Sequence, residues 1–397
     1  MVDASTQFSR MQMKLAGRKK SEDLDTSDRK TTVAPADYSA LVDGRVVAPA
    51  QTTNWVTAWT EVSGEDTFIV SAGPDTGPIV TLPLEVVQKG PFRIARFMGG
   101  SHAAGNFPAF HEGAGTLTRA HLAAAVKAIR PDVDLLYLER TLKELGGLTS
   151  PLVALPSSES PNVALAVCLD GGFEALLDRA SGKRKRKKHR SQTRKFEAAG
   201  GFRRIEASTP EEIDTLLERF FEMKAKRFRK MGIADVFAPP GVQAFFRKLF
   251  ADALSMSPPP FVLHGLEVGG TLRAITGSSR SGDRLVCEFG GIAEDELAVV
   301  SPGEFLFYQN IREACEQGFD IYDFSVGDEP YKRLWCNIET RHIDIAVPVT
   351  AKGHILAAGL AGVTKLKRTI KQNRTAWTLV KRLRRQTAAQ AEPAEDE

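Results

Sequence analysis

The order of the sequence patterns between residues 202 and 349 constrains the fold more than any other feature of this chain. A short alternating segment, FRRIEA, comes first, and two segments with helical spacing of apolar residues follow it. Three extended segments come next, FVLHGLEV, TLRAITGSS and RLVCEFGGI, separated by Gly269-Gly270 and Ser281-Gly282-Asp283, the turn chemistry of hairpins. A third helical segment, a buried strand, a polar loop and a last alternating strand follow. The predicted order is β-α-α-β-β-β-α-β-loop-β.

Cap and turn residues mark where these helices begin and end. Thr209 is placed to cap the first helix, with Pro210 in its first turn and Glu212 positioned for a capping box. The third helix begins at Pro302-Gly303 and ends at Gly318. Helical spacing predicts that the first helix turns inward Ile213, Leu216, Leu217, Phe220 and Phe221.

The first half of the chain contains a weaker copy of the same order. Strands are predicted at TFIVSA, PIVTLPLEVV and FRIARFMGG, a helix at LTRAHLAAAVKAI, and further strands at VDLLYLER and VALAVCLD. A length of 397 residues suits about two domains plus tails. A duplicated pair of lobes is therefore a plausible architecture.

Composition excludes several classes of protein. With 42% hydrophobic and 26% charged residues, the chain has the balance of a soluble globular protein. The four cysteines show no C-x-x-C spacing, and the histidines show no metal-binding grouping, so we expect no disulfide and no metal. No apolar stretch is long enough to cross a bilayer, which predicts a cytoplasmic location.

The segment SGKRKRKKHRSQTRK, residues 181–195, contains nine Lys or Arg and no acid. The net charge of +4 would be −5 without these nine residues, so the positive field is local. We predict a helix here, ended by a glycine pair. Four surroundings are compatible with this basic segment: solvent alone, a phosphate-bearing small ligand or sugar nucleotide, nucleic acid, and an anionic membrane surface. The charge balance makes nucleic acid and a membrane surface the least favoured of the four.

Several stretches resemble the CelD/BcsL group of acetyltransferase-like proteins, which is related to the FemABX transferases. The matching stretches are TTNWVTAWTEV, FRIARFMGG, the basic segment followed by FEAAGGF, and VVSPGEFLFYQNIREACEQGFDIYDFSVGDEPYKRLW. The resemblance implies an α+β fold of two tandem GNAT-like (acyl-CoA N-acyltransferase) lobes, each a mixed, mostly antiparallel sheet with flanking helices. The pyrophosphate loop typical of GNAT enzymes, Q/R-x-x-G-x-G/A, is replaced here by AVVSPGEF.

The resemblance divides the chain into five parts. A flexible N-terminal arm at 1–34 precedes the first lobe at 35–175, and a basic connecting helix at 176–201 leads to the second lobe at 202–350, which holds the predicted CoA site. A basic C-terminal helix and an acidic tail occupy 351–397.

The start of the helix at Pro302 is the predicted cofactor site. Backbone N–H groups at a helix N-terminus are unpaired and carry partial positive charge, which suits a pyrophosphate, and Gly303 would allow a close approach. The resemblance implies acetyl-CoA as the acyl donor. The alternative is that Ser301 merely caps the helix. The predicted cofactor-binding residues are Val300, Ser301, Pro302, Gly303, Glu304 and Phe305.

Acidic and donor side chains gather in YDFSVGDEPYKRLW, a strand end and the loop after it. Direct acyl transfer needs a base for the acceptor and a donor for the leaving thiolate or the oxyanion. Asp323 and Asp328 are the predicted bases, and Tyr331 and Lys332 the predicted donors. Alternatively, Tyr331 and Trp335 pack the loop and its charges are solvated. The predicted substrate-binding residues are Glu329, Trp335 and, in the glycine-rich segment GGSHAAGN, Gly105 and Asn106.

These features predict an acyltransferase that moves an acetyl or similar group from CoA to an amine or hydroxyl in a ternary complex. By the resemblance, the acceptor is a sugar, polysaccharide precursor or cell-envelope metabolite. Two alternatives stay open, a non-catalytic accessory protein of polysaccharide biosynthesis and a FemABX-like transferase that uses aminoacyl-tRNA. We do not expect other nucleic-acid partners. The basic helices allow contact with a biosynthetic complex or with the inner face of the membrane.

Overall fold

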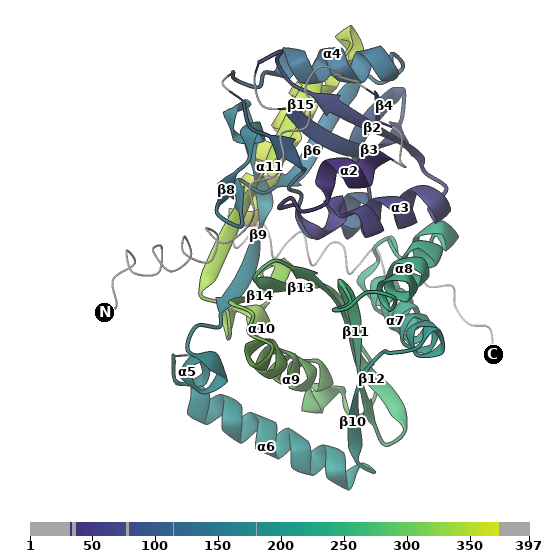
Figure 1. The fold of residues 1–397 in the computed structure, drawn as a ribbon. Coiled ribbons are helices and arrows are strands. Elements are labelled where there is room, and N and C mark those ends of the chain that lie inside the picture. Colours follow the sequence, from purple (N-terminus) through teal and green to yellow (C-terminus); the bar gives the residue numbers. More distant parts are fainter. Residues whose placement is uncertain (1–31, 34–36, 77–78, 114, 180, 373–397) are drawn as a thin grey trace, which may run out of the picture. The chain divides into compact units, whose positions relative to one another are not determined.

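We describe the protein from a computed structural model that covers residues 32–33, 37–76, 79–113, 115–179 and 181–372. The predicted N-terminal arm lies outside these ranges, apart from Thr32–Val33, and so does the acidic tail. Figure 1 shows the described helices and strands in chain order.

The first half of the chain, residues 32–168, forms strands and helices where the sequence predicts them. Its main elements are β1 (Thr32–Val33), α2 (Tyr38–Val42), α3 (Thr53–Val62), β2 (Asp66–Ala72), β3 (Ile79–Lys89), β4 (Phe92–Phe97), α4 (Arg119–Ile129), β6 (Leu135–Thr141) and β9 (Ser158–Cys168). Three two-residue strands complete it, β5 (Phe110–His111), β7 (Glu144–Leu145) and β8 (Leu148–Thr149).

Two helices, α5 (Gly172–Arg179) and α6 (Gly182–Ala198), connect the halves, and α6 is the predicted basic helix. The second half, residues 202–348, contains β10 (Phe202–Glu206), α7 (Pro210–Met231), α8 (Pro240–Ala253), β11 (Phe261–Val268), β12 (Thr271–Ser281), β13 (Arg284–Ile292), α9 (Pro302–Glu316), β14 (Ile321–Val326), α10 (Pro330–Arg333) and β15 (Ile338–Pro348). The predicted order is confirmed, with the short helix α10 added inside the predicted loop.

The start of α7 follows the sequence closely. The hydroxyl of Thr209 accepts a hydrogen bond from the backbone N–H of Glu212, as expected for an N-cap. The Glu212 carboxylate accepts from the N–H of Ser208, one residue earlier than a capping box requires. The five apolar residues predicted to face inward are all buried.

The two halves repeat one order of elements. The series β1-α2-α3-β2-β3-β4-α4-β6 in the first half corresponds to β10-α7-α8-β11-β12-β13-α9-β14 in the second. In both series the three strands before the last helix are antiparallel, and the strand after that helix pairs in parallel with the third, as β4 with β6 and β13 with β14. The sequence copy is therefore a structural repeat.

The strand that ends each half belongs to the sheet of the other half. β9 pairs antiparallel with β14, and β15 pairs antiparallel with β6. β9 and β15 also pair with each other, so the sheet runs unbroken in the order β1-β2-β3-β4-β6-β15-β9-β14-β13-β12-β11-β10. The predicted lobe bounds, which keep each strand in its own half, do not contain this exchange.

The halves also share an apolar core. The rings of Trp55 and Trp59 on α3 lie 4.9 and 4.8 Å, centroid to centroid, from the ring of Phe245 on α8. All three side chains are buried. Edge-on aromatic pairs add about 0.5–1.5 kcal/mol each beyond the burial of their surface. Contacts of this kind stabilise both halves together.

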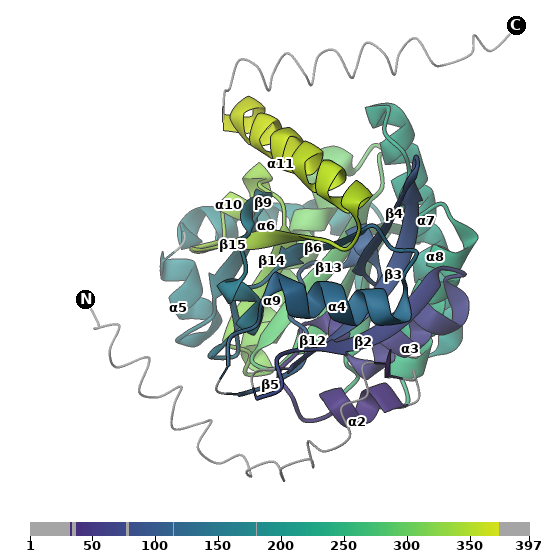
Figure 2. The ribbon, with the colours of Figure 1, turned by 90° about the horizontal axis from the view of Figure 1, so that it is seen from above.

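A helix after β15, α11 (Ala351–Gln372), runs beside that strand (Figure 2). Its first turn is anchored where the Thr350 hydroxyl donates to the Asp134 carboxylate at 2.6 Å. Within the described ranges, no helix combines the length and apolar character that crossing a membrane requires.

Candidate active site

β13 and β14 run parallel for a short distance and then separate. Their paired residues are Arg284 with Ile321, Leu285 with Tyr322 and Val286 with Asp323. Beyond Asp323, the register of β14 with β9 shifts, and Ser325 has a positive φ of 61°. A left-handed residue and a register shift both bend a strand. The second part of β13 is thereby released from β14, so its side chains can meet groups from both halves.

Glu288 lies on this released part of β13. In the pairing of β12 with β13, Gly277 lies opposite Phe289 and Ser278 opposite Cys287, so Glu288 is the extra residue of a β-bulge. Its carboxylate accepts a hydrogen bond from the Ser279 hydroxyl at 2.6 Å and another from the backbone N–H of Ala104 in the first half. The bulge thus directs an acid toward the junction of the halves.

The environment of Glu288 gives it the property of a general base. Burial raises the pKa of Glu288 to about 7; the hydrogen bond from Ser279 lowers the pKa, and the negative charge of Asp323 raises it. A carboxyl group with this pKa is divided between its neutral and ionised forms at neutral pH, so it can both take up and release a proton.

The sequence prediction missed Glu288, although a signal was present. Glu288 is the single acid in the strand RLVCEFGGI, whose other residues after Arg284 are apolar or glycine. A carboxylate on an apolar strand is costly to bury unless it is paired or its pKa is shifted.

Asp323, a predicted base, lies near Glu288 but is held by two donors. Its carboxylate accepts from Nη1 of Arg284 at 3.2 Å and from the N–H of Ser325 at 2.7 Å. Together with Gly105 and His342 it lines a cavity of about 30 Å³. This volume suits one or two water molecules and is too small for an acyl acceptor. The structure therefore brings predicted residues of both halves together at a small cavity.

Asn106 is part of the packing of the first half. Its side-chain oxygen accepts from Nε2 of Gln51 at 2.7 Å, and its Nδ2 donates to the carbonyl of Glu139 at 2.8 Å. The side chain is only 2% exposed. Because both ends of the amide are engaged inside the protein, the predicted contact of Asn106 with an acceptor gains no support from this geometry.

The acids of the loop after β14 are engaged by neighbouring cations. The exposed carboxylate of Asp328 accepts from Nε of Arg333 at 2.5 Å, and this bond lowers the pKa of Asp328. Glu329 lies 3.0 Å from Nζ of the buried Lys332, which also donates to the carbonyl of Val326 at 3.1 Å. Asp328 is thus a weak base, and Lys332 holds the loop in place.

Tyr331 and Trp335 both have packing roles in the same loop. The Tyr331 ring stacks on the ring of Phe307, with centroids 5.5 Å apart. Burial raises the pKa of Tyr331, so its hydroxyl keeps its proton at neutral pH. Trp335 is buried, and the ammonium of Lys185 lies 4.6 Å from its ring centroid. Tyr331 therefore stays a candidate proton donor.

Cys287 lies among the charged groups of this region. Burial raises the pKa of its thiol to about 12; Lys332 and Lys224 lower it, and Glu288 and Asp323 raise it. These four groups are consequently close enough to Cys287 to act on it electrostatically. The thiol therefore stays protonated at neutral pH.

The start of α9 is more enclosed than predicted. Ser301 is the N-cap residue of α9, with a φ of 64°, and its side chain makes no cap hydrogen bond. The amide of Gln192 on α6 donates to the carbonyls of Val300 at 2.8 Å and Ser301 at 3.0 Å. A Cβ atom on Gly303 would lie 2.7 Å from Cγ2 of Ile292. One flank of the predicted cofactor site is therefore covered by α6.

The other predicted cofactor residues also meet α6 or the core. Pro302 and Phe305 are buried, and the ring of His189 stacks on that of Phe305 at 4.5 Å. The carboxylate of Glu304 lies 2.5 Å from Nζ of Lys188. A role for these residues in binding the cofactor stays a prediction.

A larger cavity adjoins this place, with a volume of about 220 Å³. Figure 1 shows α6 alongside α9, and the cavity lies between these helices and the end of α10. Its lining consists of Arg184, Lys185, Lys188, Gln192, Glu304, Tyr308, Leu334 and Trp335. The structure thus brings two predicted site residues, Glu304 and Trp335, together with the basic helix.

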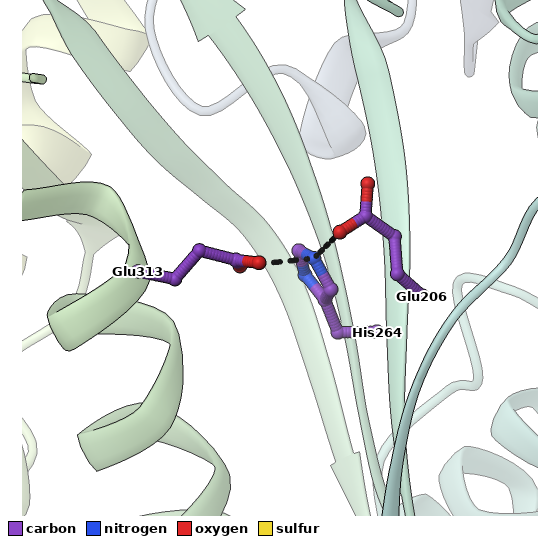
Figure 3. Close-up of side chains that lie close together, drawn as sticks. All are labelled: Glu206, His264 and Glu313. Carbon is purple, nitrogen blue, oxygen red and sulfur yellow. Dashed lines mark ion pairs between the residues drawn. The ribbon is translucent and has the colours of Figure 1, made fainter. Parts of the chain in front are cut away.

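Three side chains on β10, β11 and α9 form a separate charged cluster (Figure 3). Nε2 of His264 lies 3.4 Å from a carboxylate oxygen of Glu206 and 3.6 Å from one of Glu313. The ligand atoms lie within 4.8 Å of one another, which a divalent ion could bridge. Arg204 also bonds the Glu313 carboxylate, and burial lowers the pKa of His264. A neutral His264 and the Arg204 cation therefore account for the cluster without a metal.

One family matches the sequence. Residues 183–333 match the acetyltransferase (GNAT) domain family, and this span contains most of α6, the second half as far as α10, and Glu288. No curated protein matches the chain at a significant level.

Solved structures resemble the chain at low sequence identity. FemX is 13% identical, over 79% of this chain and 96% of that chain, with a TM-score of 0.50. The C-terminal domain of an Agrobacterium fabrum protein described as a lysylphosphatidylglycerol synthetase is 13% identical, over 83% and 97%, with a TM-score of 0.48. A tandem GNAT protein from the clavulanic acid biosynthesis pathway is 12% identical, over 82% and 97%, with a TM-score of 0.43.

At these identities the likeness to FemX concerns the fold alone. The GNAT part of the predicted resemblance is confirmed for residues 183–333, and membership of the CelD/BcsL group stays a prediction. The repeat of elements, the family match and the likeness to FemX agree with the predicted fold class: the chain has an α+β, tandem GNAT-like fold.

Proposed function

We propose that the protein is an acyltransferase that moves an acetyl or similar acyl group from CoA directly to an amine or hydroxyl acceptor. The observation that carries this proposal is the Glu288 carboxylate. It lies where β13 and β14 separate, touches both halves, and has a pKa of about 7. A base with this pKa, placed where two parallel strands separate, is suited to removing a proton from the acyl acceptor.

Two side chains of the protein divide the proton transfers in this proposal. Ionised Glu288 takes the proton from the acceptor nitrogen or oxygen as that atom attacks the acyl carbon. Tyr331 is the candidate proton donor to the leaving thiolate; its hydroxyl is protonated at neutral pH, and burial, which raises its pKa, makes it a weaker acid than a free tyrosine. CoA, when bound, supplies the acyl group as a thioester. Burial is the main cause of the raised pKa of Glu288, and the negative charge of Asp323 adds to it.

The residues beside α9 fit the nucleotide part of such a donor. The cavity of about 220 Å³ carries Arg184, Lys185 and Lys188 on its wall, which suit phosphate groups. In this proposal the cations on α6 take the place of the pyrophosphate loop that the sequence lacks. This arrangement supports acyl-CoA over a donor that carries no phosphate.

The acceptor enters from the junction of the halves in this proposal. The cavity beside Asp323 and Gly105 has a volume of about 30 Å³, so the proposal requires the segment around Ala104 to move when an acceptor binds. By the resemblance, the acceptor is a sugar, polysaccharide precursor or cell-envelope metabolite. The same reasoning keeps the proposed location cytoplasmic or at the inner face of the membrane.

One set of measurements distinguishes acyl transfer from CoA from two other candidate functions. Aminoacyl transfer from tRNA is favoured by the exposed cations Lys187, Arg194 and Lys195 on α6. A non-catalytic accessory role is favoured by the small volume of the cavity beside Asp323. Acetyl-CoA, charged tRNA and anionic vesicles are each added to the full chain, and binding is measured by calorimetry or co-sedimentation.

The proposal expects acetyl-CoA to raise the melting temperature and to release free CoA when a panel of amines and amino sugars is present. Glu288→Gln is expected to keep the rise in melting temperature and to lose CoA release. Binding of charged tRNA with steep salt dependence, and no binding of acetyl-CoA, would replace this proposal with aminoacyl transfer. Gly303→Glu is a poor test, because Gly303 has no room for a side chain.

A further inference from the structure

The segment 99–106, between β4 and β5, belongs to the first half of the chain and touches the second half at two places. The ring of His102 lies 5.0 Å, centroid to centroid, from the ring of Phe237. The backbone N–H of Ala104 donates a hydrogen bond to the carboxylate of Glu288. The position of this segment therefore decides how a donor of the first half meets the candidate base.

Arg140 on β6 holds this segment by two of its carbonyl groups. Nη1 of Arg140 donates to the carbonyl of Ala103 at 2.8 Å and to that of Ser101 at 3.1 Å. The carbonyl of Ala103 and the N–H of Ala104 belong to one peptide group, which is trans, so they point in opposite directions. The guanidinium cation thus lies at one end of this peptide and the Glu288 carboxylate at the other.

The backbone of Arg140 is itself held in an uncommon conformation. Its φ of 51° lies in the left-handed region, which residues with a side chain rarely adopt. Its N–H donates to the carboxylate of Asp344 at 2.9 Å, and its carbonyl accepts from the N–H of Asn106 at 2.9 Å. A backbone of this kind persists only where the surrounding contacts enforce it. These contacts fix the point from which the Arg140 side chain reaches the segment.

We propose that Arg140 is a positioning residue for Glu288: it holds and polarises the peptide between Ala103 and Ala104, so that the N–H of this peptide stays directed at the carboxylate. A cation bound to the carbonyl oxygen polarises the peptide and makes its N–H a stronger donor. A hydrogen bond to the charged form of an acid favours that form. Arg140 therefore favours ionised Glu288. This inference rests on the proposed function for the role of Glu288 as the base.

Groups on three strands of the second half also act on Glu288. Ser279 on β12 donates to its carboxylate at 2.6 Å, and the negative charge of Asp323 on β14 raises its pKa. The thiol of Cys287 on β13 interacts with Glu288 electrostatically and stays neutral, because burial raises its pKa to about 12. The Ala104 N–H adds a contribution from the other half of the chain to these three.

The groups around Arg140 leave its charge constant while the candidate base titrates. Burial lowers the pKa of Arg140, and the negative charges of Glu139 and Asp344 raise it, but a guanidinium group keeps its proton at neutral pH. Burial lowers the pKa of His102 and of His342 to about 4, and the charge of Arg140 lowers both further. Both rings are therefore neutral at neutral pH, and Arg140 is the cation that acts on the segment there.

The test titrates the Glu288 carboxyl in the full chain without acyl donor or acceptor, so that the segment keeps its position. Protein labelled with ¹³C at the glutamate carboxyl carbon is followed by NMR through the expected midpoint of about 7, and the Glu288 resonance is the one that Glu288→Gln lacks. Arg140→Gln is expected to raise the midpoint by about half a pH unit or more, because the charged carboxylate loses its aligned donor. Arg140→Lys keeps the cation, so a smaller rise is expected.

The matched control is Arg45→Gln. Arg45 is also a half-buried arginine of the first half, and its Nη1 donates to a backbone carbonyl, that of Phe110, at 3.2 Å. Its replacement removes the same charge and is expected to leave the midpoint of Glu288 unchanged. An equal rise in Arg45→Gln would overturn the inference, because it would show only a general loss of positive charge. An unchanged midpoint in folded Arg140→Gln would overturn it as well, and melting temperatures show that each variant is folded.

A second measurement decides the matter if Arg140→Gln does not fold. In the unaltered protein, the amide resonance of Ala104 is expected to move with the same midpoint as the Glu288 carboxyl, because the charge of the group that accepts from its N–H changes. An Ala104 resonance that stays constant while Glu288 titrates would refute the inference, since the peptide would then not connect the two side chains.

The role of Arg140 and the proposed function fail in different ways, because the titrations require no acyl transfer. A raised midpoint in Arg140→Gln, together with an absence of CoA release by the unaltered protein, would keep the action of Arg140 on Glu288 and remove the proposed activity. CoA release that is lost in Glu288→Gln, together with a midpoint that Arg140→Gln leaves unchanged, would keep the activity and remove the role of Arg140.

Discussion

The Ser279 hydroxyl on β12 donates a hydrogen bond to the Glu288 carboxylate on β13 at 2.6 Å. The bulge that leaves Glu288 without an opposite residue makes this contact between neighbouring strands possible. A hydrogen bond of this kind favours the charged carboxylate and so limits the rise in pKa that burial causes. The balance of the two effects holds the pKa of Glu288 at about 7.

The first prediction concerns the rate of acyl transfer in Glu288→Gln. Removal of a general base is expected to lower kcat/KM by about 10²–10⁴-fold. Glu288 acts in its ionised form, which increases as the pH rises through about 7, so the rate of the unaltered protein is expected to rise between pH 6 and 8 and then level off. Initial rates of CoA release across this range provide the measurement.

The control for this prediction is Ser279→Ala, which keeps the base and removes one donor to its charged form. The midpoint of the pH profile is expected to move upward, with the plateau rate largely retained. A Glu288→Gln variant that keeps the rising limb would contradict the assignment of this limb to Glu288.

The second prediction uses folding stability and needs no substrate. The folded pKa of Glu288, about 7, lies above the ordinary value of 4.5, so the folded protein binds the proton more tightly than the unfolded chain. The stabilising effect of the protonated carboxyl is complete below about pH 4.5 and is lost as the pH rises through 7. As the pH rises from 5 to 8, the free energy of unfolding of Glu288→Gln is therefore expected to increase by about 1–3 kcal/mol relative to that of the unaltered protein. Urea unfolding at several pH values measures this difference, and a constant difference would sink the prediction.

The third prediction compares the two aspartates proposed as bases. Asp328 is exposed and paired with Arg333, so Asp328→Asn is expected to change the unfolding free energy by less than about 1 kcal/mol and the rate by less than about twofold. Asp323→Asn removes a negative charge that raises the Glu288 pKa, so it is expected to lower the midpoint of the pH profile. A hundredfold loss of the transfer rate in Asp328→Asn would show instead that Asp328 is the general base.

The fourth prediction separates a structural from a substrate-binding role for Asn106. Asn106→Ala removes the buried hydrogen bonds that Asn106 makes with Nε2 of Gln51 and with the carbonyl of Glu139, which is expected to cost about 1–3 kcal/mol. KM for the acceptor is expected to stay unchanged in the folded fraction. Urea unfolding and acceptor titration are the two readouts. A stable variant with a tenfold higher KM would assign Asn106 to the acceptor instead.

The fifth prediction concerns the cluster of Glu206, His264 and Glu313. Its charges are balanced by Arg204 and by a hydrogen bond from neutral His264, so EDTA is expected to leave the melting temperature unchanged. His264→Leu removes the donor to Glu206 and is expected to destabilise the fold by about 1–3 kcal/mol. A melting temperature that falls in EDTA and recovers with Mn²⁺ or Zn²⁺ would show a metal site.

The sequence predicts most elements of the second half because their signals are local. Thr209 and Pro210 mark the start of α7, and glycine turns separate β11, β12 and β13. No such local signal in the sequence indicates which strands pair with β9 and β15. Each of these strands contains an apolar stretch that is compatible with several sheet neighbours, so the exchange between halves depends on tertiary contacts that no single segment encodes.

The candidate site shows the same division. Asp323 and Gly105 were predicted and do line one cavity, with Asp323 inside β14 and Gly105 in the segment between β4 and β5. Glu288 was missed, because its direction depends on a bulge and its pKa on burial, neither of which is visible in composition or spacing. Asn106 was predicted in a glycine-rich loop, but its side chain serves the interior.

The pairing of β9 with β14, and of β15 with β6, makes each half complete only in the presence of the other. A cut in the chain between residues 168 and 202 would leave two fragments, each missing one strand of its sheet and carrying one that its companion needs. Such fragments should assemble when expressed together and aggregate when expressed apart. A recombinant in which one half alone is replaced would therefore fold only if the new half preserved the strand that pairs with the other half.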